Sequence, residues 1–346
     1  MAKLLAQHGV TVTIITTPLN ATRNKPIIDR AIESGLHIQL RQVQFPCTDV
    51  GLPEGCETLN ALPSKDLYKN LLTGIRMLQK PVEQILAELN PRPSCIISDQ
   101  YFAWTNQTAR VLQIPRLVFD GKSCFSLSCT HNIITSKVYE SVPEMEPFVV
   151  PGLPDMIEIT RAQLPNAVNI DPTNTMDIRK ECREAELEAF GVIVNTFEEL
   201  EPAYVREVRK VRGERVWCIG PVSLTNQDNL DKAARGNKAS IDESQCLKWL
   251  DSRKPSSVVF VCLGSLSRSP SAQLIELGLG LEASNQPFIW TIRGDLLMED
   301  GEAGQERRKR AKELGEMAKK AIQGSSNLNM KLLVQDVMQE VMGKLI

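Results

Sequence analysis

Short apolar segments alternate with helix-length segments along most of this chain, and that alternation limits the fold more than any other feature of the sequence. Residues 94–98, 116–119 and 191–196 have apolar centres and lack polar alternation, which indicates strands buried on both faces. Residues 103–112 and 173–189 have the periodicity of helices and separate these strands. The order of strand, helix and strand predicts an α/β protein with a doubly wound parallel sheet.

The length of the chain and one polar stretch predict two domains. A chain of 346 residues exceeds the roughly 100–200 residues of a single domain. Residues 223–243 are nearly devoid of large apolar side chains, so we expect an interdomain linker at 223–245. The expected domains are then residues 1–222 and 246–346, with residues 302–346 forming the last helices of the second domain.

The balance of charge argues against a polyanionic partner. The 40 basic and 42 acidic residues give a net charge of -2, so no strong field attracts a nucleic acid or an anionic membrane. No run of about 18 apolar residues occurs, and residues 1–8 lack the apolar segment of a secretory signal. The nine cysteines include no Cys-x-x-Cys pair. We therefore expect a cytoplasmic protein with reduced thiols, no membrane span and no nucleic-acid partner.

The histidines show no pattern of a metal site. His8, His37 and His131 are the only histidines, and no His-x-x-x-His or Asp-x-Asp sequence occurs. A Gly-x-Ser-x-Gly nucleophile motif is also absent from the sequence. We expect no bound metal, and the sequence favours neither metal catalysis nor hydrolysis by a catalytic triad.

Two places in the sequence follow apolar strands, where an open α/β sheet presents its functional residues. Asp99 follows strand 94–98, where a carboxylate could orient an imidazole, and a role as the N-cap of the next helix is equally consistent with the sequence. Gly264 and Ser265 end a second apolar strand, where backbone amides and a hydroxyl could contact a phosphate. An ordinary strand-to-helix turn is the alternative for these two residues.

A series of short segments in order along nearly the whole chain carries a family resemblance. The segments are residues 93–99, 114–119, 150–154, 194–200, 217–221, 246–251, 256–265 and 287–290. Together they resemble the plant UDP-dependent glycosyltransferases that act on small molecules, most closely the subgroup that glucosylates flavonoids, terpenoids and hormones. Residues 307–319 are similar to the C-terminal helices of the same family.

This resemblance implies a GT-B fold, in which a first Rossmann-like domain binds the acceptor and a second binds most of the UDP-sugar. It implies an inverting, metal-independent transfer of glucose from UDP-glucose to a hydroxyl group of a small plant metabolite, with no separate cofactor and with a monomeric enzyme. In the family a histidine takes the acceptor proton and an aspartate orients that histidine. By resemblance, Asp99 is the orienting aspartate, and Gly264 and Ser265 contact the donor diphosphate.

Two departures from the family pattern lead us to expect weak or no activity from a truncated form. The family histidine precedes the helix that begins here at Met1, so this sequence has no counterpart for it. The donor-binding box with its His-Cys-Gly-Trp-Asn-Ser signature has no counterpart after Arg293, so we expect an incomplete second domain. Loss of a general base costs about 10²- to 10⁴-fold in rate, and each lost donor contact costs about 1–3 kcal/mol.

Two other functions stay open. A non-catalytic small-molecule binding protein, or a regulatory partner of full-length glycosyltransferases, would use the first domain without the donor machinery. A nicotinamide-dependent oxidoreductase would also have two α/β domains, but residues 278–283 place a glycine pattern late in a helix instead of directly after a strand. Acceptor binding without UDP binding identifies the first alternative, and an NADH titration tests the second.

Overall fold

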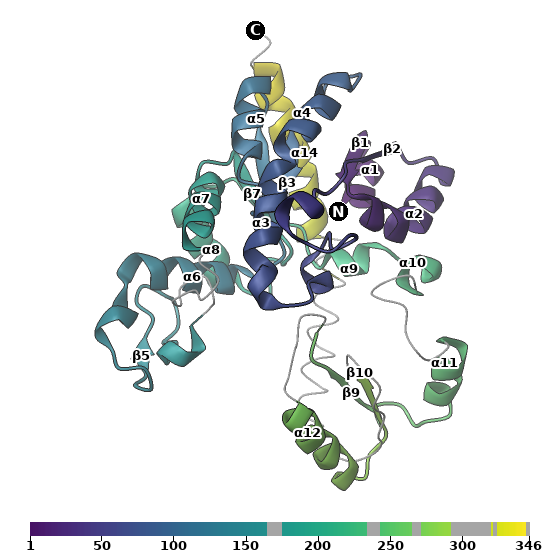
Figure 1. Ribbon diagram of the computed structural model, residues 1–346, viewed down its shortest axis with the longest axis vertical. Coiled ribbons are helices and arrows are strands. Elements are labelled where there is room, and N and C mark those ends of the chain that lie inside the picture. The colour runs from purple at the N-terminus through teal and green to yellow at the C-terminus, as the bar shows by residue number, and fades with distance from the viewer. Residues whose placement is uncertain (165–174, 234–242, 265–270, 292–319, 321–323, 344–346) are drawn as a thin grey trace. The chain divides into compact units, whose positions relative to one another are not determined.

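The computed structural model shows a chain of two compact units (Figure 1). It describes residues 1–164, 175–233, 243–264, 271–291, 320 and 324–343. The first unit comprises Met1–Asn226 with Met317–Ile346, and the second comprises Gln227–Glu316. Asp99 therefore belongs to the first unit and Gly264 to the second.

A four-stranded parallel sheet with the strand order β3-β4-β7-β8 forms the centre of the first unit. Its strands are β3 (Ile96–Ser98), β4 (Arg116–Asp120), β7 (Gly191–Val194) and β8 (Val216–Cys218). Valine and isoleucine fill these strands because branched side chains suit a pleated, buried surface. Every residue of β7 and β8 is buried. The parallel α/β sheet expected from the apolar segments is confirmed.

One face of this sheet packs against α6 (Cys124–Ser136) and α8 (Pro202–Arg212). Val118 of β4 and Val192 of β7 share an apolar cluster with Val205 of α8. Helix α8 begins with a proline, which the first turn tolerates because an N–H there has no partner within the helix. This packing anchors α6 directly after the loop that follows β4.

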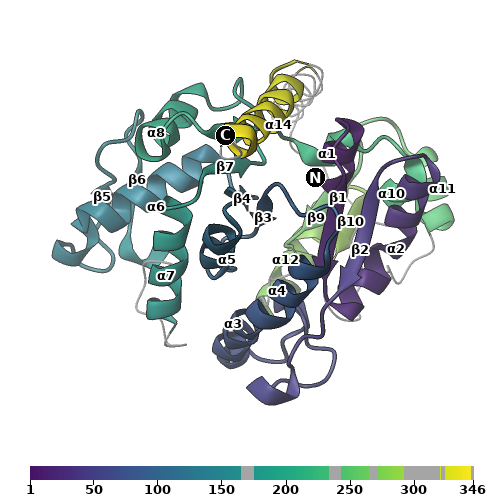
Figure 2. The ribbon, with the colours of Figure 1, turned by 90° about the horizontal axis from the view of Figure 1, so that it is seen from above.

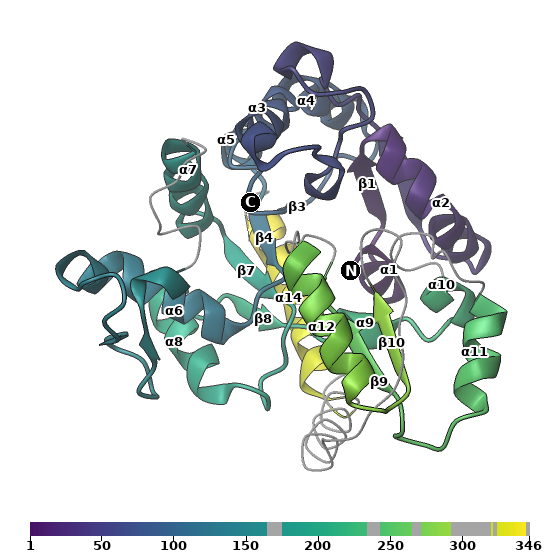
Figure 3. The same ribbon diagram turned by 60° about the horizontal axis from the view of Figure 1, so that its bottom comes forward.

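The opposite face packs against α1 (Ala2–Gln7) and α14 (Ser325–Gly343), and Figure 3 shows α14 alongside β8. Ile193 of β7 and Met330 of α14 are both fully buried in the cluster on this face. The sequence placed residues 302–346 in the second domain, whereas the described helix of that segment, α14, belongs to the first unit. Its strand partner lies far earlier in the chain, so its place in the sequence does not reveal this contact.

A separate two-stranded parallel sheet pairs β1 (Val12–Thr16) with β2 (Ile38–Gln42), and α2 (Pro18–Glu33) connects the two strands (Figure 2). No backbone pairing joins β1 to β3 among the described residues, so the single expected sheet appears as two parallel sheets. Val12 and Ile97, one from each sheet, nevertheless belong to the same apolar cluster. Both sheets thus contribute to one core.

The helical periodicity of residues 67–89 is divided between α3 (Tyr68–Met77) and α4 (Gln79–Glu88). Pro81 explains the division, because it has no N–H to donate to the carbonyl four residues earlier and is tolerated only in the first turn of a helix. The other elements of the first unit are α5 (Thr105–Leu112), α7 (Met176–Leu187), α9 (Val222–Thr225) and the antiparallel pair of β5 (Phe148–Val149) and β6 (Glu158–Ile159).

The second unit is built around a two-stranded parallel sheet of β9 (Val259–Cys262) and β10 (Phe288–Thr291). Its helices are α10 (Asn229–Ala233), α11 (Glu243–Asp251) and α12 (Ser271–Ala283). Phe260 in β9 keeps 66% of its surface exposed. Within the described parts of the chain, no helix is long and apolar enough to cross a membrane.

Candidate functional site

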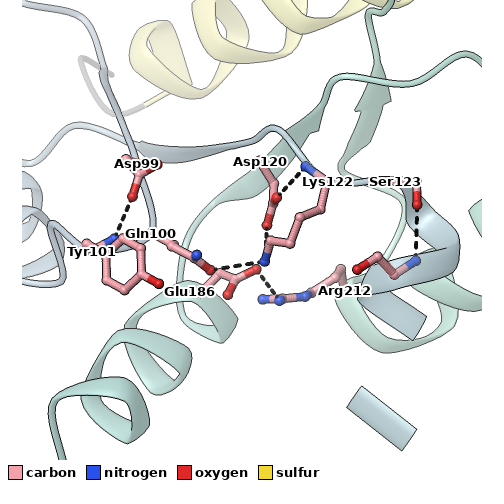
Figure 4. Close-up of polar contacts among 9 residues, drawn as sticks. Asp99, Gln100, Tyr101, Asp120, Lys122, Ser123, Glu186 and Arg212 are labelled. Carbon is pink, nitrogen blue, oxygen red and sulfur yellow. Dashed lines mark hydrogen bonds and ion pairs between the residues drawn. The ribbon is translucent and has the colours of Figure 1, made fainter. Parts of the chain in front are cut away.

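Asp99 directly follows β3 and lies at the carboxyl edge of the four-stranded sheet (Figure 4). Its Oδ1 accepts a 2.9 Å hydrogen bond from the backbone N–H of Tyr101, which closes a short turn. Helix α5 begins at Thr105 and has Trp104 as its N-cap, so Asp99 does not cap this helix. The N-cap role that the sequence allowed is therefore wrong, and Asp99 is a carboxylate presented at the sheet edge.

Asp120 ends β4 and joins Asp99 at this edge, because neighbouring parallel strands present their carboxyl ends on the same side. Asp120 is 3% exposed, and its Oδ1 accepts a 2.8 Å hydrogen bond from the backbone N–H of Lys122. The Nζ of Lys122 lies 3.0 Å from Asp120 Oδ2, as an ion pair without hydrogen-bond geometry. The same Nζ donates a 3.2 Å hydrogen bond to Gln100 Oε1. Figure 4 shows this ammonium between the loops that follow β3 and β4.

The pKa of Asp99 reflects opposing influences at the sheet edge. Neighbouring protein atoms take some water from the carboxyl group and raise its pKa above the ordinary value, although the residue as a whole is exposed, which keeps this rise modest. The N–H of Tyr101 opposes this rise, Asp120 adds to it through like charge, and Lys122 again lowers the pKa. The net result is a raised pKa, which marks a group whose negative charge is costly to hold in the folded protein.

Glu186 of α7 adds a third carboxylate to the same charged cluster. It is buried, and its Oε1 accepts a 2.5 Å hydrogen bond from Arg212 Nη2 at the end of α8. Burial raises the pKa of Glu186, Arg212 and Lys122 lower it, and Asp120 raises it further. The charges of Asp120 and Lys122 thus affect the pKa values of both Asp99 and Glu186.

A buried guanidinium supplies a fixed positive charge to this cluster. Arg116, the first residue of β4, is 2% exposed. Its Nε donates to Ser98 Oγ at 3.2 Å, and its Nη1 donates to the Ala185 carbonyl at 2.7 Å. Burial lowers the pKa of Arg116 to about 10, so the group stays charged at neutral pH.

Sequence reasoning found Asp99 but missed the other charged residues of this cluster, Arg116, Asp120, Lys122, Glu186 and Arg212. Asp120 had a usable signal, because it follows the apolar residues 116–119 as Asp99 follows residues 94–98. Glu186 and Arg212 had none, because they lie in amphipathic helices among many exposed charges and meet only in the folded chain.

Gly264 follows β9 in the second unit and is exposed. Its φ of +83° lies in the left-handed region that favours glycine, and none of the described residues lies within 4 Å of the position a Cβ would take. The backbone after this strand is therefore open to an approaching group. Ser265 lies outside the described residues, so the diphosphate contact expected from Gly264 and Ser265 stays a prediction.

The structure does not bring a histidine to Asp99. His8 follows α1 and lines a shallow hollow of ≈ 210 Å³, and burial together with nearby Lys331 lowers its pKa. His131 lies in α6, where burial and then Arg212 lower its pKa. In the described chain, no histidine is among the charged groups that act on Asp99.

Comparison with known proteins finds relatives among the UDP-glycosyltransferases. The chain is 53% identical over 299 residues to UDP-glycosyltransferase 73E1 of Stevia rebaudiana, which covers 85% of this chain and 60% of that protein. It is 48% identical over 296 residues to UDP-glycosyltransferase 73C1 of Arabidopsis thaliana, with the same two coverages of 85% and 60%. No protein-family model matches the chain.

Similarity to UDP-glycosyltransferases is also found among solved structures. UGT73P12 of Glycyrrhiza uralensis, complexed with glycyrrhetinic acid 3-O-monoglucuronide, has a TM-score of 0.76 and 36% identity, covering 92% of this chain and 63% of that one. UGT89C1 of Arabidopsis thaliana, complexed with UDP-L-rhamnose, has a TM-score of 0.63 and 25% identity, covering 89% of this chain and 63% of that one.

Parallel α/β units with a carboxylate at the sheet edge, together with these structural neighbours, define the class of protein as the GT-B fold with an incomplete second domain. Over 85% of its length, the chain is homologous to the plant UDP-glycosyltransferases. The resemblance found in the sequence is confirmed. The chain spans about 60% of the length of the curated relatives it matches.

Proposed function

We propose that this chain carries the acceptor-binding half of a UDP-glycosyltransferase that transfers glucose from UDP-glucose to a hydroxyl group of a small plant metabolite such as a flavonoid, a terpenoid or a hormone. The observation that carries the proposal is the carboxylate of Asp99 at the carboxyl edge of a sheet homologous to that of the UDP-glycosyltransferases. Relatives bound to a glucuronide and to UDP-L-rhamnose support a small-molecule acceptor and a UDP-sugar as the two ligand classes.

The proposed reaction is inverting and uses no metal. A base takes the proton of the acceptor hydroxyl, whose oxygen bonds to the anomeric carbon as the bond to UDP breaks on the opposite face. Asp99 has the role of orienting an imidazole base and stabilising the positive charge that the base gains. Its turn with Tyr101 supports this role, because the hydrogen bond occupies one oxygen and leaves Oδ2 for the base.

Consecutive parts of the sequence have different proposed roles. Residues 1–222 bind the acceptor, residues 223–245 are the linker, and the shortened UDP-sugar domain begins at residue 246 and excludes helix α14, which packs in the first unit. Gly264 and Ser265 contact the diphosphate, a role that the open backbone at Gly264 supports. We also propose a cytoplasmic monomer, which light scattering and a fluorescent fusion protein test.

Activity of this chain is proposed to be impaired. No His-Cys-Gly-Trp-Asn-Ser sequence occurs in it, and His8, His37 and His131 are its only histidines. In the described chain, the Asp99 carboxylate accepts a hydrogen bond from the Tyr101 N–H, and no histidine donates to it. A rate lower by about 10²- to 10⁴-fold is expected from the lack of a positioned base alone.

Release of UDP from UDP-glucose in the presence of a panel of flavonols tests this proposal. We expect turnover far below that of a full-length relative, and, because no histidine of this chain is held by Asp99, we expect Asp99→Asn to lower it no further than Asp66→Asn does. Asp66→Asn is the matched control, because Asp66 lies in an exposed short helix away from the strand ends. Turnover equal to that of a full-length relative would contradict the proposed impairment.

A second candidate function is non-catalytic binding of a small molecule, or regulation of full-length glycosyltransferases. The contrast between the buried strands of the first unit and the exposed Phe260 of the second favours it, because only the first unit has fully covered strands among the described residues. Calorimetry with a flavonol and with UDP separates the two candidates. Acceptor binding without UDP binding supports the second candidate, and binding of both supports the first.

A further inference from the structure

We propose that Lys122 is a positioning residue for Asp99, whose ammonium joins the loops after β3 and β4 and so keeps the Asp99 carboxylate charged and correctly oriented. The inference rests on the proposed function, in which Asp99 orients a base. It assigns to Lys122 a role that acts through Asp99, without contact to the reacting atoms.

The contacts of Lys122 reach both loops. Its Nζ lies 3.0 Å from Asp120 Oδ2, at the end of β4, and donates to Gln100 Oε1 at 3.2 Å. Gln100 is the residue after Asp99, so this bond ties down the loop that carries the Asp99 carboxylate (Figure 4). The backbone N–H of Lys122 is itself held by Asp120 Oδ1 at 2.8 Å. A displacement of Lys122 would therefore move both loops.

The ammonium of Lys122 pairs with Asp120, and its charge also acts on two further carboxylates, those of Asp99 and Glu186. Carboxylates that share a partly buried site disfavour one another's ionised form unless a cation lies among them. Lys122 is the ion-pair partner of Asp120, and its charge favours the ionised forms of both Asp99 and Glu186. One ammonium thus acts on all three groups.

The two arginines of the cluster, Arg116 and Arg212, form hydrogen bonds with other groups. Arg212 donates to Glu186 at 2.5 Å, and Arg116 donates to Ser98 and to the Ala185 carbonyl from the start of β4. Neither of these bonds reaches the loops that follow β3 and β4. The Lys122 side chain is 42% exposed while that of Asp120 is 2% exposed, so the ammonium stands at the surface of the edge where Asp99 is presented.

A titration of Asp99 in the full chain tests this inference without any need for turnover. We suggest labelling aspartate with carboxyl ¹³C, assigning the Asp99 signal with Asp99→Asn, and following its chemical shift with pH. The groups expected to act on this signal are Tyr101, Asp120, Lys122 and Arg116. Lys122→Met removes the charge but keeps the length of the side chain, and it is expected to raise the pKa of Asp99 by about half a unit or more.

Two further variants separate positioning from a structural role. Lys122→Arg keeps the charge and is expected to leave the titration close to that of the original chain. Lys137→Met is the matched control, since Lys137 is 65% exposed and lies 4.0 Å from Glu140 on another part of the surface. A residue with a merely structural role would lower the melting temperature without moving the Asp99 titration.

An unchanged Asp99 titration in folded Lys122→Met overturns the inference, and so does an equal change in Lys137→Met. Should Lys122→Met fail to fold, Gln100→Leu breaks the bridge on the β3 side without removing a charge. That variant is expected to shift the Asp99 signal, and an unchanged signal would also overturn the inference. Failure of the proposed function is a different result, namely that calorimetry detects binding of neither a flavonol nor UDP while Lys122→Met still moves the Asp99 titration.

Discussion

The two units of this chain differ in how completely they cover their strands. In the first unit, helices cover both faces of β7, and Ile193 has no exposed surface. In the second unit, β9 alternates between half-buried and exposed residues, and Phe260 keeps 66% of its surface exposed. A parallel strand normally needs both faces covered. The comparison teaches that homology over most of a chain can leave the described strands of one unit fully covered and those of the other partly exposed.

The largest expected effect is a difference in core stability between the two units. Ile193→Ala removes a fully buried side chain from the centre of the first unit, so we expect a loss of about 2–5 kcal/mol in its free energy of unfolding. Phe260→Ala removes a larger but exposed side chain, and we expect a change within about 0.5 kcal/mol. Urea unfolding of the full chain, followed by tryptophan fluorescence, measures both.

The positions of the tryptophans allow the unfolding of each unit to be followed separately by fluorescence. Trp104 and Trp217 lie in the first unit, while Trp249 and Trp290 lie in the second. Replacing the last two by phenylalanine leaves a signal from the first unit alone, and the difference between this signal and that of the unreplaced chain reports on the second unit. A loss after Phe260→Ala as large as that after Ile193→Ala would show that β9 is covered in solution, and the contrast between the units would then fail.

An intermediate effect is expected where α14 meets the first unit. Asn329 is buried, and its Nδ2 donates to the Cys218 carbonyl at 3.0 Å and to Glu198 Oε1 at 3.2 Å. Asn329→Ala leaves both acceptors without this donor, so we expect a loss of about 1–3 kcal/mol in the free energy of unfolding of the first unit. Gln339→Ala, at an exposed position of the same helix, is the matched control. Equal effects of the two variants would contradict the assignment of α14 to this unit.

The sequence predicted the parts of the fold that depend on local pattern. The strands β4 and β7 were predictable because their central residues are apolar without polar alternation, and Asp99 was predictable as the residue after such a segment. The division at Pro81 follows from the missing N–H of proline, a signal that the helical periodicity around it obscured.

The rest depends on contacts between distant residues. The position of α14 is set by its apolar stripe and by β8, which no local pattern connects. Lys122 looks like any solvated lysine until the fold brings Gln100 and Asp120 to it. The separation of β1 and β2 from the larger sheet likewise depends on backbone pairing, which apolar patterning does not specify.

The smallest expected effect concerns Asp99 at the sheet edge of the first unit. Its negative charge is part of the proposed role of orienting a base but lowers the stability of the fold. Because the folded protein raises the pKa of Asp99 above its ordinary value of 3.8, folding favours the protonated form. The stability contributed by this group is complete below pH 3.8 and is lost as the pH rises through the folded pKa. Asp99→Asn keeps an oxygen for the Tyr101 N–H and never ionises.

We therefore expect Asp99→Asn to have a slightly higher melting temperature than the original chain at neutral pH, with the difference shrinking below pH 3.8. Calorimetric scans at several pH values measure this, and Asp66→Asn, at an exposed position, should show no such gain. A lower melting temperature for Asp99→Asn at neutral pH would mean that its charge stabilises the fold. In that case the Asp99 carboxylate would have a stabilising, structural role at the sheet edge. The first unit would then no longer differ from the second by keeping a charge that costs folding free energy.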